Sequence, residues 1–499
     1  MKALIVVLVI GTIVFRIAKP IALQFSAEQD FLRRRNVWFA LTVTAFLSPS
    51  FWLYVLVATP LFAWAGRKDS NPVALYLLLL HVIPFTPVEI PIAGINALFP
   101  LDNYRLLSLC VLIPTALRLR HSTDGLRIRG LTAMDALLLC YGALQIAFFI
   151  PPDLPNHVIL PDSFTNALRR AFLFFIDVYV LYFVVSRSCS SRRAIVEAQA
   201  AFCLSGVLMA SVALFETLRH WLLYVDIATR WTNDTSFAFY LTRGNALRAE
   251  ATTGNALVLG YLLAIAYGFW LYLRLHLKPK QPKMAVTLIL WLGLLATYSR
   301  GPWIGALVIF FIFAALGPRA FSGLFKAGAV VAVVGGVVAL SPLGEQIISV
   351  LPFMGGTIDS GSVAYRLEVT QRVWELIQAN PIFGDHRPWI KMEDLRQGFG
   401  IIDLVNSYAQ IALYYGLCGL SLFVGFILVG LSKTYLFART LMSSDPDLAS
   451  LGACITACIL GTLLMISSNS FELGLVKMYY VLAGLAAAYA HLSTSRETR

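Results

Sequence analysis

The sequence predicts an all-α, polytopic integral membrane protein with about 14 transmembrane helices. Hydrophobic residues make up 58% of its 499 residues and charged residues only 13%, a far more apolar balance than that of a soluble domain. Most of the chain falls into apolar runs of about 17–25 residues, the length that crosses about 30 Å of hydrocarbon as a helix. We therefore expect residues 1–499 to form a single transmembrane domain.

The N-terminal runs are the least regular. Residues 3–15 are apolar but are followed by Arg16 and Lys19 rather than by a small-residue cleavage site, so we expect a retained helix. Residues 37–65 are too long for one span and short for two, and a hairpin at Ser48–Ser50 would keep the neighbouring basic residues on one side. The spans expected after this hairpin are residues 72–88, 104–117, 132–150, 166–186, 194–217, 254–273, 284–299, 302–317, 324–341, 406–432, 448–468 and 474–491.

Basic residues concentrate in alternate short breaks between these runs. Such breaks lie at residues 118–129, 187–193, 274–283, 319–326, 433–439 and 496–499. All of them fall on one side if each interval is a pair of spans, and the positive-inside rule makes that side the cytoplasm. The net charge of +12 is thereby explained by membrane topology rather than by nucleic-acid binding. The two long outward loops are residues 218–253 and 342–405.

The longer outward loop combines charges of both signs with several aromatic residues, a composition that suits a polar ligand with flat faces. Within it, residues 365–377 space their apolar side chains three to four apart, which predicts an amphipathic helix ended by Asn380-Pro381.

A second outward feature is the turn Thr297-Tyr298-Ser299-Arg300-Gly301-Pro302-Trp303, where one apolar run ends and the next begins. We expect Gly301 to permit the turn and Pro302 to occupy the first position of the new helix. Arg300 would then lie at a helix N-terminus, which favours a phosphate or pyrophosphate. An interfacial arginine that extends its charge towards water is an equally good interpretation of Arg300 alone.

The segment Arg243-Gly244-Asn245-Ala246-Leu247-Arg248-Ala249-Glu250 leads into a span whose helix Asn255 is placed to cap. Arg248 would lie at the same membrane face as Arg300, and two arginines at one depth can clamp a diphosphate. Taken alone, Arg248 is better explained as ordinary loop charge paired with Glu250.

Polar residues also mark the start of the 406–432 run. Asp403, Asn406 and Gln410 recur at helical spacing, with Tyr408 nearby, so they are candidates for substrate contacts. A helix cap is the competing interpretation for Asp403 or Asn406. Glycines follow in Tyr415-Gly416-Leu417-Cys418-Gly419, where they permit close helix packing.

Four of these segments occur in a fixed order between residues 240 and 430. They are the approach from Arg248 to Asn255, the Ser299-Arg300-Gly301 turn, the Arg366–Trp374 helix running into Asn380-Pro381-Ile382-Phe383-Gly384, and Asn406-Ser407-Tyr408 followed by Gly416-Leu417-Cys418-Gly419. In this order and on one side of the membrane, they resemble the bacterial O-antigen ligase and polysaccharide polymerase family.

The resemblance implies a type-C glycosyltransferase-like fold and a metal-independent enzyme without a cofactor. It implies a donor in which undecaprenyl pyrophosphate carries a glycan, used at the periplasmic face of the bacterial inner membrane. Ligases of the family carry a His-Asn pair before the glycine segment, and here that pair is Val405-Asn406. The missing His favours a polymerase of exopolysaccharide, capsule or O-antigen over a ligase. A repeat-unit flippase and a chain-length regulator are the expected companions of a polymerase.

The chemistry assigns roles to particular residues. A pyrophosphate leaving group gains charge in the transition state, so Arg248 and Arg300 are candidates for stabilising it. The acceptor hydroxyl needs a base, for which Asp403 is preferred to His386. Further candidates for substrate binding are Arg366, Arg372, Asn406, Tyr408 and Gln410.

A transporter or flippase is the alternative from another class. Asp177 lies within the 166–186 run, and an intramembrane carboxylate is a candidate for proton coupling. We favour a structural pairing of Asp177 with a neighbouring helix, because no second mid-membrane acid and no broken helix accompanies it, and expect Asp177→Asn to lower stability by about 1–2 kcal/mol.

Overall fold

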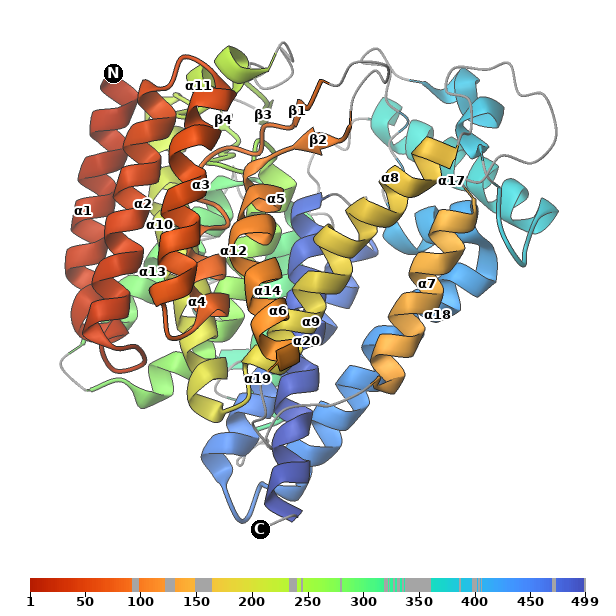
Figure 1. Cartoon of the computed structure of the whole chain (residues 1–499). Coiled ribbons are helices and arrows are strands. Elements are labelled where there is room, and N and C mark those ends of the chain that lie inside the picture. Colours follow the sequence, from red (N-terminus) through yellow and green to blue (C-terminus); the bar gives the residue numbers. More distant parts are fainter. Residues whose placement is uncertain are drawn as a thin grey trace.

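The computed structural model is a bundle of helices with two short β-hairpins at one end (Figure 1). The described residues are 1–91, 98–121, 131–148, 164–232, 240–243, 246–278, 281–317, 360–385, 387–396, 402, 404, 406–468 and 473–497, with isolated positions between 322 and 336.

The helices account for nearly all of the predicted spans that fall on described residues. Their bounds are α1 Lys2–Ala22, α2 Glu28–Leu47, α3 Phe51–Lys68, α4 Pro72–Leu79, α5 Asn103–Leu107, η1 Ser108–Leu112, α6 Ile113–His121, α7 Ala133–Ala147, α8 Phe164–Phe174, η2 Phe175–Tyr179, α9 Val180–Ser188, α10 Arg192–Arg219, α11 Val225–Trp231, α12 Ala256–Leu273, η4 Arg274–His276, α13 Lys283–Ala296, α14 Arg300–Ala315, α17 Ser360–Ala379, η5 Pro388–Leu395, α18 Ser407–Thr440, α19 Pro446–Ile466 and α20 Leu473–Glu497. The strands are β1 Val88–Glu89, β2 Pro100–Leu101, β3 Thr242–Arg243 and β4 Ala246–Leu247, paired antiparallel as β1 with β2 and β3 with β4.

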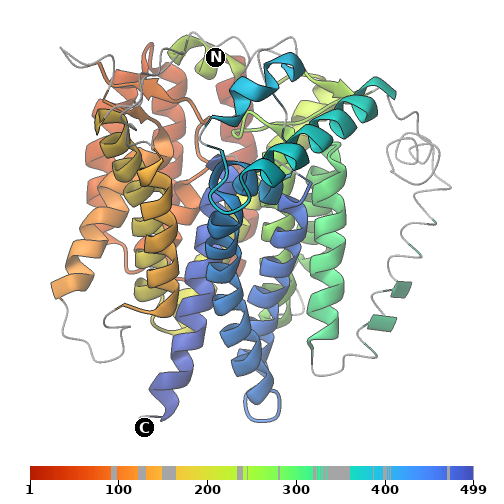
Figure 2. The ribbon, with the colours of Figure 1, turned by 90° about the vertical axis from the view of Figure 1, so that its right-hand side faces the viewer.

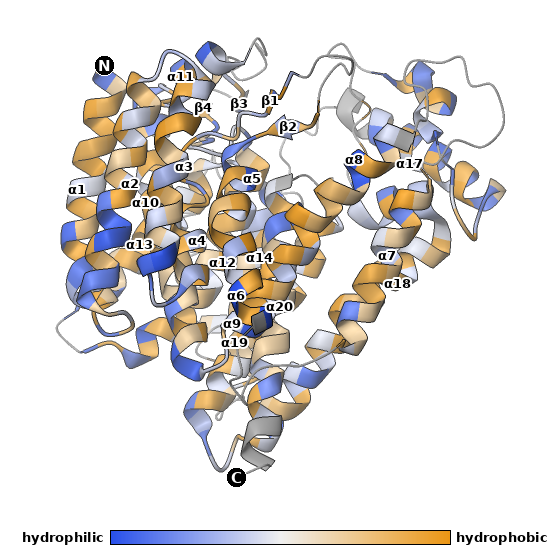
Figure 3. Ribbon diagram, in the orientation of Figure 1, coloured by the Kyte–Doolittle hydropathy of each residue, from blue (hydrophilic) through white to orange (hydrophobic). Residues whose placement is uncertain are grey.

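Six of the described helices are long and apolar enough to cross a membrane, namely α1, α10, α12 extended to His276, α18, α19 and α20. Three shorter apolar helices, α7, α13 and α14, accompany them. In the ribbon coloured by hydropathy, hydrophobic residues predominate along the middle of the helices, and many of the hydrophilic ones lie towards the helix ends (Figure 3). The chain is therefore a multi-pass membrane protein, while the number of about 14 spans stays a prediction.

Ion pairs show that the ends predicted to share one side do lie together. Arg192 at the start of α10 lies 3.5 Å from Asp447 at the start of α19, and His276 after α12 lies 3.9 Å from the same carboxylate. At the end of α9, Arg187 pairs at 2.7 Å with Asp135 in the first turn of α7. The other ends of α10 and α12, at Arg219 and Ala256, consequently lie at the opposite end of the bundle.

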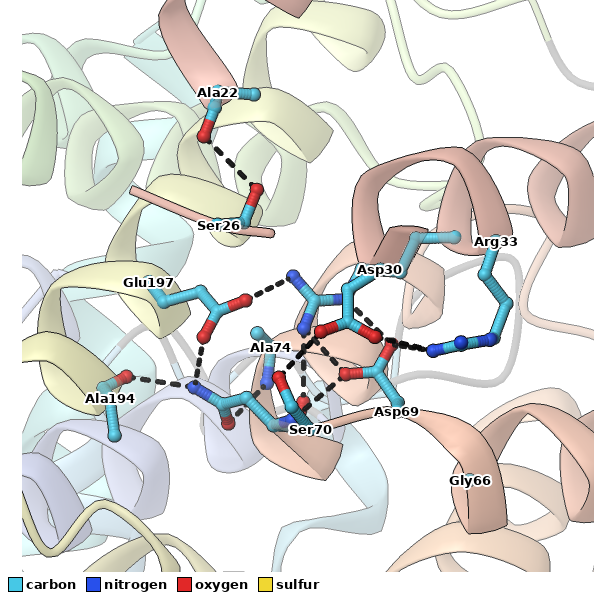
Figure 4. A network of polar contacts seen from close by, with 12 residues as sticks. Ala22, Ser26, Asp30, Arg33, Gly66, Asp69, Ser70, Ala74, Ala194 and Glu197 are labelled. Atoms are coloured by element: carbon cyan, nitrogen blue, oxygen red, sulfur yellow. Dashed lines mark hydrogen bonds and ion pairs between the residues drawn. The ribbon is translucent and has the colours of Figure 1, made fainter. Parts of the chain in front are cut away.

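A buried polar network ties the N-terminal hairpin to the same end (Figure 4). Arg34 of α2 donates two hydrogen bonds to the Asp69 carboxylate, at 2.9 and 2.6 Å, and its remaining nitrogen lies 2.9 Å from Glu197 of α10. Asn71 donates to the other Glu197 oxygen at 3.2 Å.

The hairpin predicted at Ser48–Ser50 is confirmed, because α2 ends at Leu47 and α3 begins at Phe51.

The expected span over residues 72–88 is wrong. The helix ends at Leu79, and the chain then continues without helical hydrogen bonding towards β1. Prolines at 84, 87 and 91 explain the ending, because proline cannot donate to a helix and disfavours helical backbone in the residue before it. The non-helical segment packs instead on residues 251–254, where Phe85 N donates to Thr252 O at 3.2 Å.

Asp177 is a structural counterion, as the sequence analysis favoured, but in a larger network than expected. Its carboxylate lies 2.7 Å from Lys477 of α20 and 3.0 Å from Arg105 of α5, and Arg105 also pairs with Asp102 at 3.2 Å. All four side chains are buried. Asp102 lies just before α5 and outside the predicted span of residues 104–117, so only the fold brings this second acid to the network.

We therefore revise the expected effect of Asp177→Asn to a loss of about 3–5 kcal/mol, because two buried cations would lose their shared counterion. Thermal unfolding in detergent measures this loss. The double variant Asp177→Asn with Lys477→Met should recover part of it, since Asp102 still neutralises Arg105. A single variant as stable as the wild type would contradict the structural role.

Candidate functional site

The turn between α13 and α14 offers main-chain oxygens to neighbouring arginines. Tyr298 has a φ of 47°, a left-handed conformation uncommon for a residue other than glycine. Arg300 begins α14, as predicted. The roles expected for Gly301 and Pro302 were wrong, because Tyr298 makes the turn and both residues lie within the first helical turn. Such strained residues often flank functional sites.

The hairpin of β3 and β4 lies against this turn. Ala249 N donates to Ala296 O at 3.0 Å, while Arg248 N donates to Leu241 O at 2.9 Å to continue the hairpin pairing. The Arg248 side chain donates to Thr297 O at 3.3 Å and to Ser299 Oγ at 3.0 Å. Across the hairpin, Arg243 donates to Tyr298 O at 3.0 Å. Two arginines are thus held by the turn that precedes Arg300.

Four arginines come together here, and we call Arg243, Arg248, Arg300 and Arg366 the arginine cluster. Burial, and then the charges of the other three, lower the pKa of Arg243. Arg300 Nε is buried without a hydrogen-bond partner, which is rare for a buried donor. Among the described residues, no carboxylate lies within 4.0 Å of a nitrogen in the cluster. The cluster is therefore a concentration of positive charge suited to a polyanion.

Arg243 and Glu250 are the residues that sequence reasoning missed as candidates. The dipeptide Gly244-Asn245 is typical of a tight hairpin turn and could have predicted that Arg243 lies beside Arg248. No sequence signal distinguishes Glu250. The ion pair expected between Arg248 and Glu250 is absent within 4.0 Å in this described segment, although their charges act on one another.

α17 carries Arg366 into the cluster and lies across the outward end of the bundle (Figure 2). The predicted amphipathic helix is present, and Val369 and Val373 on its buried face pack on Met392 and Leu395 of η5. Two turns beyond Arg366, Arg372 points elsewhere. It donates to Lys391 O at 3.0 Å and to Asp394 Oδ2 at 3.1 Å, so the structure does not bring it into the cluster.

α18 is broken at Gly416, and the segment after α17 fills the break. Gly416 has a φ of 63° and a ψ of −168°, which interrupts the helical hydrogen bonds. Pro381 O and Ile382 O accept from the amides of residues 417 and 418 at 2.8 and 3.0 Å, and Asp385 N donates to Leu413 O at 2.7 Å. We call residues 380–385 together with residues 413–418 the glycine junction. The sequence predicted the order of these two segments along the chain, and the structure shows that they contact one another.

Three of the remaining candidates lie at the start of α18. Asn406 caps α18, with its side-chain oxygen accepting from the amides of Tyr408 and Ala409 at 2.9 and 3.1 Å. The Tyr408 hydroxyl donates to Leu463 O of α19 at 2.7 Å. Gln410, one turn further, is half-buried. Asp403 and His386 lie outside the described residues, as do most of residues 342–359.

No grouping of three His, Cys, Asp or Glu side chains that could hold a metal ion occurs in the described part of the chain. The expectation of a metal-independent reaction stays a prediction.

The fold and the cluster together define a multi-pass helical membrane protein with four arginines gathered at the end of the bundle opposite Arg192 and His276. Residues 285–424 match the family model described as O-antigen ligase, which confirms the predicted relationship for this part of the chain. The matched stretch contains Arg300, Arg366 and the glycine junction, whereas Arg243 and Arg248 precede it. No curated protein matches the chain. Members of the family are glycosyltransferase-like enzymes that act on lipid-linked glycans in a membrane.

Proposed function

We propose that this protein is a glycan polymerase that transfers repeat units from undecaprenyl-pyrophosphate donors at the periplasmic face of the inner membrane. The observation that carries the proposal is the arginine cluster, which gathers four guanidinium groups from three separate segments and makes no ion pair within 4.0 Å to a carboxylate of the described residues. A diphosphate is the group of the donor that needs such a set, because its charge increases as the glycosidic bond to it breaks.

The placement of the cluster supports the periplasmic assignment. The basic breaks lie at the other end of the bundle, which the positive-inside rule assigns to the cytoplasm. A donor whose lipid tail lies in the bilayer would present its diphosphate at the level where α14 begins and α12 is capped by Asn255. The outward loops 218–253 and 342–405 would then lie beside its glycan.

The polymerase is preferred to the ligase because position 405 is Val rather than the His of the ligases. A transporter driven by protons is disfavoured, because the membrane carboxylate Asp177 is already paired with two cations. An additional base or orienting group for the acceptor is still required, and Asp403 and His386 are its candidates from the sequence.

The test is chain growth by purified protein in liposomes that contain only undecaprenyl-pyrophosphate-linked repeat units. We expect products longer than one repeat, and no requirement for a lipid A-core acceptor. Products that form only when that acceptor is supplied would instead establish a ligase, and absence of transfer with either acceptor would contradict the glycosyltransferase. Gel analysis of the released glycans distinguishes the three outcomes.

A further inference from the structure

Glu250 is held beside the arginine cluster by an unusual set of main-chain contacts. Its amide and that of Ala251 donate to one carboxylate oxygen of Glu216 in α10, at 3.1 and 2.8 Å. Its carbonyl accepts from the amide and the hydroxyl of Thr253, at 3.0 and 2.7 Å. Ala251 has a φ of 46°, a conformation that persists only where the surroundings enforce it. The backbone of Glu250 is therefore fixed on both sides.

The carboxylate of Glu250 lies close enough to Arg248 of the cluster for their charges to act on one another. Leu247 and Ala249, on either side of Arg248 in the chain, are buried against the bundle. The residue is 6% exposed, and its carboxylate accepts no hydrogen bond from any described residue. Because these unpartnered oxygens are not fully buried, the exposed part of the residue includes the carboxylate.

The charges around this carboxylate keep its proton exchangeable near neutral pH. Burial, and then the nearby Glu216 carboxylate, raise the pKa of Glu250 to about 7, and Arg248 opposes both effects. Glu216 comes from α10 and Arg248 from the same segment as Glu250. Other titratable groups near this turn are Tyr224 and His81, which line one pocket with Ala251 and Thr252, and Nδ1 of His81 is hydrogen bonded to the Tyr104 hydroxyl. A carboxylate of this kind is partly ionised at the pH at which a periplasmic enzyme works.

We propose that Glu250 is the general base that takes the proton of the acceptor hydroxyl in glycan transfer. This inference rests on the proposed function. The acceptor O–H bond breaks and its proton goes to the Glu250 carboxylate, while the acceptor oxygen bonds to the anomeric carbon of the donor sugar. The bond from that carbon to the diphosphate oxygen breaks, and its electron pair leaves with the polyprenyl diphosphate held by the arginine cluster. The proton on Glu250 then returns to water.

The position of Glu250 supports this role over that of a simple counterion. A base must lie near the carbon that is attacked, and that carbon is one bond from the diphosphate that Arg248 would hold. An ion pair with Arg248 would neutralise both groups, yet none forms within 4.0 Å among the described side chains. Efficient bases have a pKa near the working pH, which the buried setting of Glu250 provides.

The experiment compares Glu250→Gln and Glu250→Asp with the wild type, using the liposome assay over pH 5–9. For Glu250→Gln we expect kcat to fall by about 10²–10⁴-fold, and the rise of kcat/KM with pH around neutrality to disappear. Glu250→Asp keeps a carboxylate one methylene further away, so it should retain a rise with pH at a reduced rate. Glu368→Gln, which removes an exposed acid of α17, should match the wild type.

Inhibition by inorganic pyrophosphate separates the catalytic role from a structural one. Removing the charge of Glu250 should leave pyrophosphate binding unchanged or stronger, because it removes a carboxylate near Arg248. Weaker inhibition would mean that Glu250 only positions Arg248, and would overturn the proposal. An unchanged pH profile in Glu250→Gln would also overturn the proposal, as would loss of the neutral-pH rise in Asp403→Asn instead.

If Glu250→Gln does not insert into the membrane, the pH profile of Glu250→Asp decides between the two roles. Absence of transfer by the wild type would overturn the proposed function itself. Transfer by the wild type with any of the contrary results above would overturn only the role of Glu250.

Discussion

Replacing Arg248 or Arg300 by alanine is expected to stop chain growth, so that single repeat units accumulate on the lipid. Each arginine would lose contacts to a diphosphate that strengthen in the transition state, a loss of about 3–4 kcal/mol or roughly 10²–10³ in rate. Lysine should rescue either position poorly, because an ammonium keeps the charge without the two-pronged geometry. The liposome assay with purified lipid-linked repeats measures the rate and the product length.

Arg372→Ala is the matched control for these variants. Arg372 lies on the same helix as Arg366 and at the same end of the protein, but its guanidinium pairs with Asp394 at 3.1 Å, away from the cluster. We expect at most a few-fold change in rate, since exposed ion pairs contribute about 1 kcal/mol or less. Full-length polymer from both Arg248→Ala and Arg300→Ala would refute the diphosphate site.

Gly416→Ala should undo the glycine junction. A Cβ atom at this position would lie 2.2 Å from Ile382 O and 2.3 Å from Ile382 C, which are main-chain atoms that cannot rotate away. The backbone at Gly416 also lies in a region that is nearly exclusive to glycine. Strain and overlap together should cost roughly 3–6 kcal/mol. Faster hydrogen exchange at the amides of Leu417 and Cys418 would report the undocking, and chain growth should fall with it.

Gly425→Ala tests the same substitution in the same helix without these contacts. No atom lies within 4 Å of the Cβ that it would add, and the residue is in regular helix. Alanine there should stabilise α18 by up to about 1 kcal/mol, because glycine lowers helix stability. Equal stability and equal amide exchange in the two variants would show that the junction does not depend on Gly416.

The membrane class and the arrangement of the ends follow from composition and charge alone. Apolar runs must satisfy their backbone hydrogen bonds as helices in lipid, so their lengths predicted most of the described spans. The ion pairs of Arg192, His276 and Arg187 link the ends that the basic breaks had assigned to one side. The run at 72–88 was misassigned because its hydropathy is that of a span, and hydropathy takes no account of the prolines after α4 that prevent the helix from continuing.

The candidate site was only partly accessible from the sequence. Arg248 and Arg300 could be paired in advance because both lie near helix starts that the sequence predicts on one side of the membrane, and both belong to the cluster that the structure describes. Arg366 and Arg372 looked equivalent on one helix. Their different environments depend on η5, because Asp394 of η5 pairs with Arg372, whereas Arg366 lies in the arginine cluster.

Local sequence therefore specified most of the described helices and caps such as Asn255 and Asn406, because these depend on neighbouring residues and on the bilayer. Contacts between distant segments decided the rest. Gly384 and Gly416 are 32 positions apart, and only the docking of one on the other explains why both require glycine. Likewise, Glu250 becomes a candidate base only because Glu216, from a different helix, holds its backbone while burial raises its pKa. No spacing within a single segment carries that information.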